Sequence, residues 1–435
     1  MSARHRLRPI ALALAAVAAA PIGWLAVQST SHAQSIDPKR ARTLVVGASR
    51  SGSQAERVDP GRTGLSRTAL PAGPVRVEWR RALGSAVEHA PLVDDAGNIH
   101  VVVGRGDVVL LASDGTEKAR VVTGALQVGP AALTADGTVV FVSASGEAIG
   151  VRAGALRYRT RIGRNENAAP AASPLALDDG GVALATPYDL ALLDAEGNVR
   201  ARATAPEPLA APLVSALGKI ICVGASGAVY SWQPGREPSR VGTFGAPIDG
   251  AAALVDDHTL VAVTAAHLDL VAVDLARGTN LTRSTAAVGA YLGPPATRGG
   301  AVLLFGLTPS GSSLVAIDAT GQIVGEVALT SSTPPITPDG GPPPLVIPPH
   351  GGMLVDPAGT VAFVAPDGQT GVVHGATGTV ETVTEVVCSR ISPSPSMRPG
   401  MTLAAGPSLA PAGAGAFVVA CANGALARIS RTTTE

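Results

Sequence analysis

The chain has 435 residues, of which 46% are hydrophobic and 15% charged, and its formal net charge is zero. This supply of apolar side chains excludes an intrinsically disordered protein. The balanced charge and the low aromatic content of 3% argue against nucleic-acid binding, which needs a basic surface with aromatic stacking platforms.

The first 33 residues have the layout of a signal peptide. Arg4, Arg6 and Arg8 precede an apolar run over residues 10–27, and Ser31 and Ala33 are small residues at the third and first positions before a cleavage point. We therefore predict a cleaved signal peptide over residues 1–33, a periplasmic or extracellular protein, and no stable membrane span after cleavage. An uncleaved membrane anchor is the alternative, because the apolar run is just long enough to span a bilayer.

Residues 34–74 are polar, rich in Arg, Ser and Gly, and have no hydrophobic period. Such a segment is typical of a solvated arm. We predict a flexible N-terminal linker over residues 34–74 that contains no packed strand. Deletion of residues 34–70 is then expected to leave stability nearly unchanged.

One pattern recurs from residue 75 onward. In its first full copy, short apolar strands at residues 91–93, 99–103 and 108–112 alternate with turns that contain Asp and Gly, which is typical of antiparallel hairpins. The first turn of each copy contains, in order, Asp95, Ala135, Asp179, Ala216, Asp256, Arg298, Pro357 and Gly413. The first six turns lie roughly 40 residues apart, the repeat length of a propeller blade. The predicted fold is all-β, a single β-propeller over residues 75–435 with eight four-stranded blades; seven blades is the alternative.

The last copy ends after two strands, at residues 417–421 and 425–429, and has no outer strand of its own. Residues 75–80 alternate apolar and polar side chains, so we predict that this N-terminal strand completes the C-terminal blade and closes the ring. The two longest spacings predict insertions at residues 331–349 and 389–406. Loops of this length are often functional, and both are predicted contact surfaces.

The third strands and their turns read Ala191–Asn198, Val271–Gly278 and Ala316–Gln322. They resemble the A-x-D-x-x-T-G repeat of PQQ-like (quinoprotein-type) β-propellers, over about residues 74–431. That family includes dehydrogenases that use pyrroloquinoline quinone and also cofactor-free eight-bladed scaffold proteins. The dehydrogenases have an adjacent Cys-Cys pair, a calcium site and a Trp beneath the quinone.

This chain departs from the dehydrogenase pattern. Its cysteines are not adjacent, and only Trp79 and Trp232 follow the signal peptide. The resemblance therefore implies a cofactor-free scaffold, with no catalytic, cofactor-binding or metal-binding residues to carry over.

Other candidate motifs have structural explanations. The acidic pairs at residues 94–95, 178–179 and 256–257 lack the D-x-D-x-D-G spacing of a calcium loop, and we predict that they form hairpin turns. The Arg-Gly-Asp tripeptide at residues 105–107 is likewise predicted to be a turn between two strands. His89 and His100 flank one turn without metal-site spacing.

An exported protein meets an oxidising compartment. Cys388 and Cys421 lie in neighbouring blades on either side of an insertion, whereas Cys222 lies across the ring. We predict a Cys388–Cys421 disulfide and a buried free thiol at Cys222.

Together these features predict an exported, non-catalytic β-propeller that acts as a protein-binding scaffold for a partner of unknown identity. The alternatives are a divergent quinoprotein-like enzyme and a propeller that binds a small ligand or glycan. Both alternatives would use the central channel.

Overall fold

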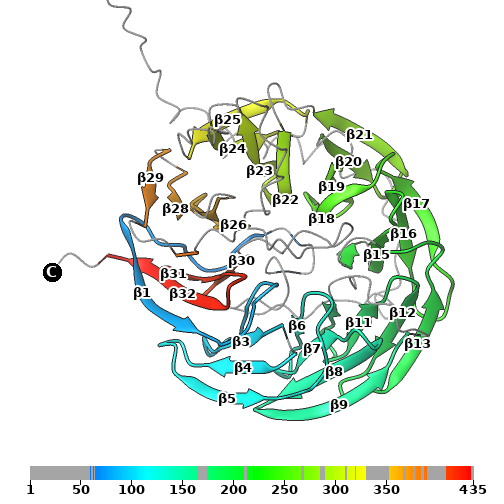
Figure 1. Cartoon of the computed structure of the whole chain (residues 1–435). Helices are drawn as coiled ribbons and strands as arrows, with labels where there is room; N and C mark the ends of the chain where they lie inside the picture. Colours follow the sequence, from blue (N-terminus) through cyan, green and yellow to red (C-terminus); the bar gives the residue numbers. More distant parts are fainter. Residues whose placement is uncertain are drawn as a thin grey trace, which may run out of the picture.

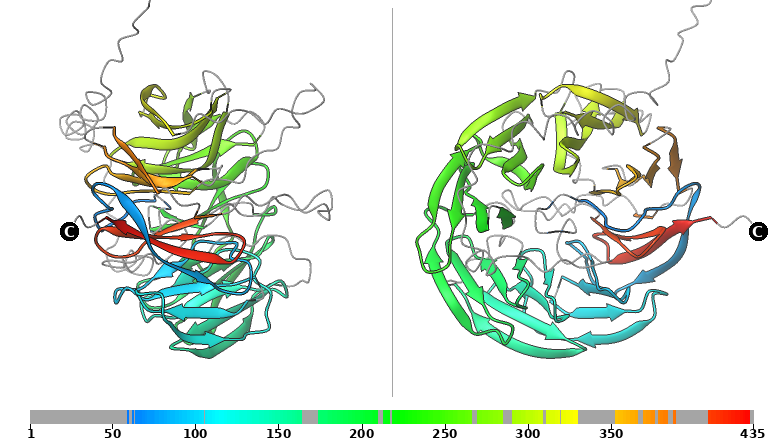
Figure 2. Two further views of the ribbon diagram at one scale, coloured as in Figure 1. Left: turned by 60° about the vertical axis from the view of Figure 1, so that its left-hand side comes forward. Right: turned by 180° about the vertical axis from the view of Figure 1, so that it is seen from behind.

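The computed structural model describes residues 59, 62 and 64–432, except 105, 164–173, 210–212, 217, 266–268, 285–289, 309–310, 319, 330–351, 366–368, 376–377, 384–386 and 389–407. In this part of the chain every regular element is a strand, and 32 strands form eight four-stranded antiparallel sheets. The sheets are the blades of one ring (Figure 1 and Figure 2). The predicted eight-bladed propeller is confirmed.

Each blade contributes one strand to each of four concentric layers. The innermost strands are β2 (Leu92–Val93), β6 (Ala132–Leu133), β10 (Leu175–Ala176), β14 (Val214–Ala216), β18 (Ile248–Leu254), β22 (Ala290–Arg298), β26 (Gly352–Val355) and β30 (Ser408–Pro411). The second strands are β3 (Ile99–Val102), β7 (Val139–Val142), β11 (Val182–Ala185), β15 (Lys219–Val223), β19 (Thr259–Thr264), β23 (Ala301–Thr308), β27 (Val361–Val364) and β31 (Ala416–Ala420). The third strands are β4 (Val108–Leu111), β8 (Glu147–Arg152), β12 (Asp189–Leu193), β16 (Ala228–Trp232), β20 (Leu270–Asp274), β24 (Gly311–Ile317), β28 (Thr370–Val373) and β32 (Ala425–Arg431). The outer strands are β5 (Glu117–Val121), β9 (Ala155–Arg161), β13 (Val199–Thr204), β17 (Ser239–Thr243), β21 (Thr279–Ser284), β25 (Ile323–Ala328), β29 (Val380–Thr382) and β1 (Val75–Ala82).

The second and third strands are nearly continuous apolar runs because neighbouring blades cover both of their faces. All four residues of β3, β7 and β11 are buried. The core is divided into clusters that join adjacent blades; one of them combines residues of blades 3 and 4 around the fully buried Trp232. The outer strands, in contrast, alternate exposed and half-buried residues, as in β9.

The order of the strands gives the ring two different faces. The hairpins that join the first strand to the second, and the third to the fourth, lie on one face, which we call the turn face. The hairpins between second and third strands lie on the opposite face, together with the segments that lead from one blade to the next. We call this second side the connector face.

Aspartates on the turn face hold the hairpins in shape. Asp194 Oδ1 accepts the backbone N–H groups of Glu196 (3.1 Å) and Asn198 (2.7 Å), and Asp318 Oδ1 accepts those of Thr320 (2.8 Å) and Gln322 (3.0 Å). Burial opposes ionisation of these carboxyls, but the hydrogen bonds prevail and lower the pKa of both. The Asp of the A-x-D-x-x-G repeat is therefore a turn residue.

The N-terminal strand closes the ring as predicted. β1 pairs with β32 in antiparallel register from Val75↔Arg431 to Ala82↔Ala425, with one irregularity after Val77. Blade 8 consequently has the strand order β1-β32-β31-β30. This pairing removes the open sheet edge that the C-terminal strand would otherwise present.

Aromatic side chains lock two of the blade interfaces against glycines of the next blade. Trp79 of blade 8 lies over the turn of blade 1, where a Cβ on Gly115 would come within 2.9 Å of its ring, and Trp79 Nε1 donates to Ser113 O (3.0 Å). Tyr158 of blade 2 lies in the same way against blade 3, where a Cβ on Gly197 would come within 2.4 Å of the tyrosine ring. In both turns only a glycine leaves room for the ring.

The predicted linker over residues 34–74 is wrong in its last part. Arg62 and Ser66 are fully buried and Leu70 is 2% exposed, so Arg62 and residues 64–74 form a packed arm. The arm leads from the centre of the ring to β1, between blade 7 and blade 8 (Figure 1 and Figure 2). The sequence shows no period here because the arm packs irregularly and not in a sheet. Residues 34–58 lie outside the described part of the chain, as does the predicted signal peptide.

We expect Gly115→Ala to destabilise the protein more than Gly235→Ala. Both glycines lie in turns between third and outer strands and have similar positive φ values, 83° and 84°, so each substitution incurs roughly 1–2 kcal/mol of backbone strain. No atom lies within 4 Å of a Cβ at Gly235, whereas the Trp79 ring blocks the one at Gly115. Overpacking should add roughly 1–3 kcal/mol. Equal melting temperatures of the two variants would contradict the aromatic lock.

Candidate interaction surface and the central channel

The N-terminal arm enters the central channel, the place where the alternative functions would need a ligand. Leu65 forms a parallel bridge with Val355 of β26. Ser66 N donates to Val355 O (2.7 Å), and Val355 N donates to Gly64 O (2.9 Å). The arm thus forms a single parallel β-bridge with the inner edge of blade 7.

The side chain of Arg62 contacts the blades on the opposite side of the ring. Its Nε donates to Leu213 O (3.1 Å) and its Nη2 to Pro174 O (2.7 Å). Pro174 and Leu213 immediately precede the innermost strands of blades 3 and 4, so both carbonyls lie at the connector-face end of the channel. The fully buried guanidinium therefore links blades 3 and 4 to the arm.

Beyond Ser66 the arm crosses the turn face of blades 7 and 8. Leu70 N donates to Asp356 Oδ2 (2.9 Å), and Gly415 N donates to Ala69 O (2.8 Å). The other oxygen of Asp356 accepts Thr360 N (2.8 Å). Asp356 is only 1% exposed, whereas Asp94 in the corresponding turn of blade 1 is half-buried; the arm covers Asp356.

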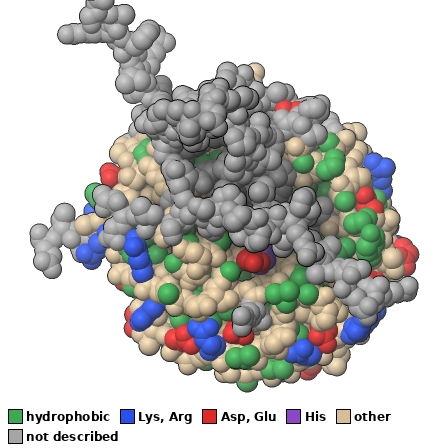
Figure 3. All heavy atoms as spheres, in the orientation of Figure 1, with side chains coloured by type: hydrophobic (Ala, Val, Ile, Leu, Met, Phe, Trp, Pro, Cys, Tyr) green, Lys and Arg blue, Asp and Glu red, His purple; other side chains and the backbone are tan. Residues whose placement is uncertain are grey.

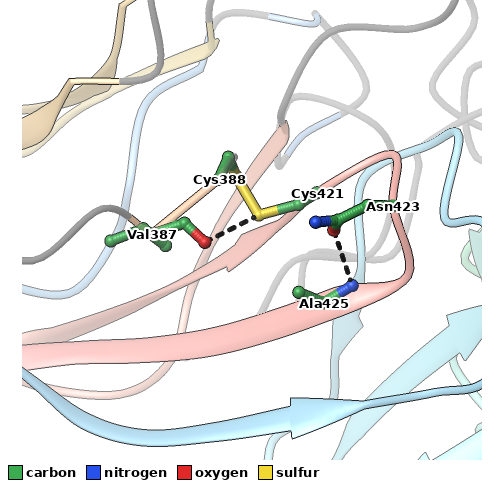
Figure 4. The surroundings of a disulfide bond; sticks show 5 residues. All are labelled: Val387, Cys388, Cys421, Asn423 and Ala425. Atoms are coloured by element: carbon green, nitrogen blue, oxygen red, sulfur yellow. Dashed lines mark hydrogen bonds between the residues drawn. A yellow bond between two sulfur atoms is a disulfide. The ribbon is translucent and has the colours of Figure 1, made fainter. Parts of the chain in front are cut away.

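The predicted disulfide is present between Cys388 and Cys421, with a Cα–Cα distance of 5.5 Å (Figure 4). It joins the segment after β29 of blade 7 to the hairpin between β31 and β32 of blade 8. Both cysteines belong to a core cluster with Leu409 and Phe417. Cys222 is free and buried, and burial raises the pKa of its thiol to about 12. A thiol in this environment is structural and not a nucleophile.

The acidic pairs lie in hairpin turns, as predicted. Asp179 Oδ1 accepts Gly181 N (3.0 Å), and Asp256 Oδ1 accepts the N–H groups of His258 and Thr259 (2.9 and 2.7 Å). Asp94 accepts Asn98 N (2.8 Å) and contacts His100 Nε2 (3.2 Å). Burial opposes its ionisation, yet the hydrogen bonds from His100 and Asn98 lower the pKa of Asp94 to about 2. Among the described residues no three His, Cys, Asp or Glu side chains gather as metal ligands would.

The remaining sequence motifs have local roles. Gly106 N donates to Val103 O (2.6 Å), so the Arg-Gly-Asp segment is a turn between β3 and β4, although Arg105 itself is outside the described residues. Burial lowers the pKa of His89 to about 4, and this imidazole is neutral at pH 7. No helix in the described ranges is long and apolar enough to cross a membrane.

Three exposed apolar side chains lie on the connector face of blades 1–3. Val122 is 75% exposed and Leu126 is 54% exposed, both on the segment from β5 to β6, and Tyr188 is 57% exposed in the hairpin between β11 and β12. The backbone beneath them is fixed, because Ala144 N donates to Leu126 O (2.8 Å) and Ala205 N donates to Tyr188 O (2.7 Å). These three residues, here called the apolar connector patch, were not singled out by the sequence analysis.

The two predicted insertions lie outside the described residues. The strands that flank them show on which face of the ring they begin and end. Each insertion follows an outer strand and precedes the innermost strand of the next blade, β25 to β26 and β29 to β30, so both begin and end on the connector face. Charged side chains of both signs are interleaved around the rim (Figure 3).

No protein-family model matches the chain, and no curated protein matches its sequence. Solved structures do match its fold. The crystal structure of BamB from Moraxella catarrhalis has a TM-score of 0.55 at 17% identity, over 82% of this chain and 99% of that chain. The computationally designed Ika8 protein has a TM-score of 0.57 at 12% identity, over 83% of this chain and 99% of that one. At these identities the likeness concerns the fold alone.

We expect removal of the disulfide to lower stability substantially. The bridge spans a sequence separation of 33 residues, and a loop of that length contributes ~3–4 kcal/mol by restricting the unfolded chain. A Cys388→Ala/Cys421→Ala variant should therefore melt well below the parent protein, and adding a reductant should affect only the parent. Peptide mapping without reduction that found Cys222 in a bridge would contradict the pairing.

We also expect Arg62→Ala to destabilise the protein, by roughly 1.5–3 kcal/mol for lost hydrogen bonds of a charged group. Arg67→Ala, at an exposed arginine of the same arm, is the matched control; because contacts of exposed charged side chains contribute only about 0.2–1 kcal/mol, its effect should be the smaller of the two. Thermal unfolding of both variants checks this. A flexible linker would instead give two unchanged melting temperatures. The chain as folded is an eight-bladed β-propeller closed into one ring, a fold that it shares with BamB.

Proposed function

We propose that the protein is an exported, non-catalytic β-propeller that acts as a scaffold and binds another protein through its connector face. The apolar connector patch is the observation that supports this most directly. Single exposed apolar residues are common on any protein surface, but here a Val, a Leu and a Tyr lie on one face of three successive blades. Tyrosine is among the residues that contribute most to protein interfaces.

The position of the backbone strengthens the proposal. Hydrogen bonds hold the main chain at Leu126 and Tyr188, so neither side chain needs to be ordered by a partner. A surface that is already ordered loses less conformational entropy when it binds. The two insertions start and finish on the same face and would extend this contact area.

The channel supports the same conclusion. A quinone, a small ligand or a glycan at the centre of the ring would have to share that space with Arg62 and the strand at Leu65. The disulfide joins two blades and leaves no adjacent Cys-Cys pair, and Trp79 and Trp232 serve blade packing. Export rests on the N-terminal signal pattern, and cell fractionation of the tagged full chain tests it directly.

The contact surface is tested by a Val122→Asp/Leu126→Asp/Tyr188→Asp variant. The matched control is Leu156→Asp/Ile323→Asp, two exposed rim residues of similar hydrophobicity, 45% and 44% exposed. Both variants should melt within a few degrees of the parent, since exposed substitutions change stability little.

The three immobilised proteins are then exposed to the native envelope fraction, and bound proteins are quantified by mass spectrometry. We expect at least one partner protein to be recovered equally by the parent and by the Leu156→Asp/Ile323→Asp control. Its recovery by the Val122→Asp/Leu126→Asp/Tyr188→Asp variant should be at least tenfold lower. Identical sets on all three proteins would exclude the connector face of blades 1–3 as the contact.

A further inference from the structure

We infer that the central channel is a peptide-binding groove with a subsite for a guanidinium group, which the protein fills with its own N-terminal arm. This inference concerns a different surface from the connector patch and does not depend on the proposed function. Its basis is the manner in which the arm is held. A segment that only filled space would make apolar packing contacts. This arm instead makes main-chain hydrogen bonds to a sheet edge and side-chain hydrogen bonds from a buried arginine, which are the contacts of a bound peptide.

The first contact is a β-bridge to a sheet edge. The inner edges of the innermost strands face the channel, and β26 uses this edge to pair with the arm. The bridge between Leu65 and Val355 is parallel, with hydrogen bonds of 2.7 and 2.9 Å on its two sides. Addition of an extended peptide to a sheet edge is a general mode of peptide recognition, in which main-chain hydrogen bonds provide affinity and side-chain subsites provide specificity.

The second contact is the side-chain subsite. The Arg62 guanidinium is fully buried and donates to Leu213 O and Pro174 O from two different nitrogen atoms. Two carbonyls from neighbouring blades match the forked donors of a guanidinium, which stays charged at all ordinary pH values. A lysine has one donor centre and cannot reach both in the same geometry.

Arg62 also shows that the peptide adapts to the groove. Its φ is 58°, in the left-handed region that a non-glycine residue rarely adopts. Residues held in this region persist only where their surroundings determine the conformation. The contacts of the side chain and the bridge at Leu65 together provide that constraint.

The ligand class follows from these contacts. The groove takes a peptide that ends a turn at an arginine, as Arg62 N does by donating to Asp59 O (3.0 Å), and that has an apolar residue three positions later, as at Leu65. In the intact chain the arm is covalently attached, so its effective concentration at the groove is high and a free peptide cannot compete. The groove becomes testable once the arm is severed in the folded protein.

The experiment introduces a protease cleavage sequence between Ala72 and Gly73 of the full mature chain, since Ala72 is exposed. The protein is purified folded, cut, and passed over a gel-filtration column, and mass spectrometry shows whether the arm fragment stays with the ring. The same is done with Arg62→Ala and, as the matched control, Arg67→Ala. We expect the parent and control arms to be retained and the Arg62→Ala arm to be lost.

A second measurement does not depend on folding of the variants. A fluorescent peptide of residues 59–72 is added in excess to the cut parent protein, exchange with the severed arm is allowed to reach equilibrium, and binding is followed by anisotropy. The peptide should bind, its Arg62→Ala form should bind roughly tenfold or more weakly, and uncut protein should bind neither. Equal binding of the two peptides, equal retention of all three arms, or loss of every arm without peptide binding would each overturn the inference.

Discussion

The pairing of β1 with β32 is the contact on which the rest of the molecule depends. It joins residues from the two ends of the chain, and the ion pair between Glu78 and Arg428 spans 350 residues of sequence. Because the entropy of closing a loop grows only slowly with its length, one paired strand can close the whole ring. β1 must begin on the turn face to run antiparallel to β32. The preceding chain therefore has to reach that face, and the arm does so through the channel and across blades 7 and 8.

The seam around blade 8 is strengthened by further contacts that no other blade combines in the described residues. The disulfide joins blade 7 to blade 8, the arm bridges the turn faces of both, and Trp79 packs on the turn between the third and outer strands of blade 1. Arg81 Nε adds a hydrogen bond to Gly115 O at the same place (2.9 Å). These bonds hold together the blade that is assembled from two distant segments of the chain.

Much of the fold could be predicted from the sequence, because each blade uses local signals. Short β-branched strands and Asp-containing turns recur at a regular spacing, and the missing outer strand of the last copy indicates closure by residues 75–80. The Cys388–Cys421 pair followed from blade order. The aromatic locks could also have been found, since Trp79 and Tyr158 occupy outer strands that precede the glycine turns at Gly115 and Gly197. The arm could not. Its contacts are main-chain hydrogen bonds and one buried arginine, and neither leaves a periodic pattern in a polar segment.

The apolar connector patch was missed for a related reason. Val122 and Leu126 lie in an extended segment where side chains alternate between buried and exposed, and a sequence pattern cannot say which side faces solvent once the strand period ends. Structure decides it: Thr123, Ala125 and Gln127 are buried, which turns Val122 and Leu126 outward. The two faces of the ring therefore differ in kind. On the turn face, aspartates accept hydrogen bonds from the backbone of their own turns and the arm covers two blades, while the connector face presents the exposed apolar side chains of Val122, Leu126 and Tyr188. A partner that binds by burying apolar surface gains more there than on a face whose polar groups are already paired.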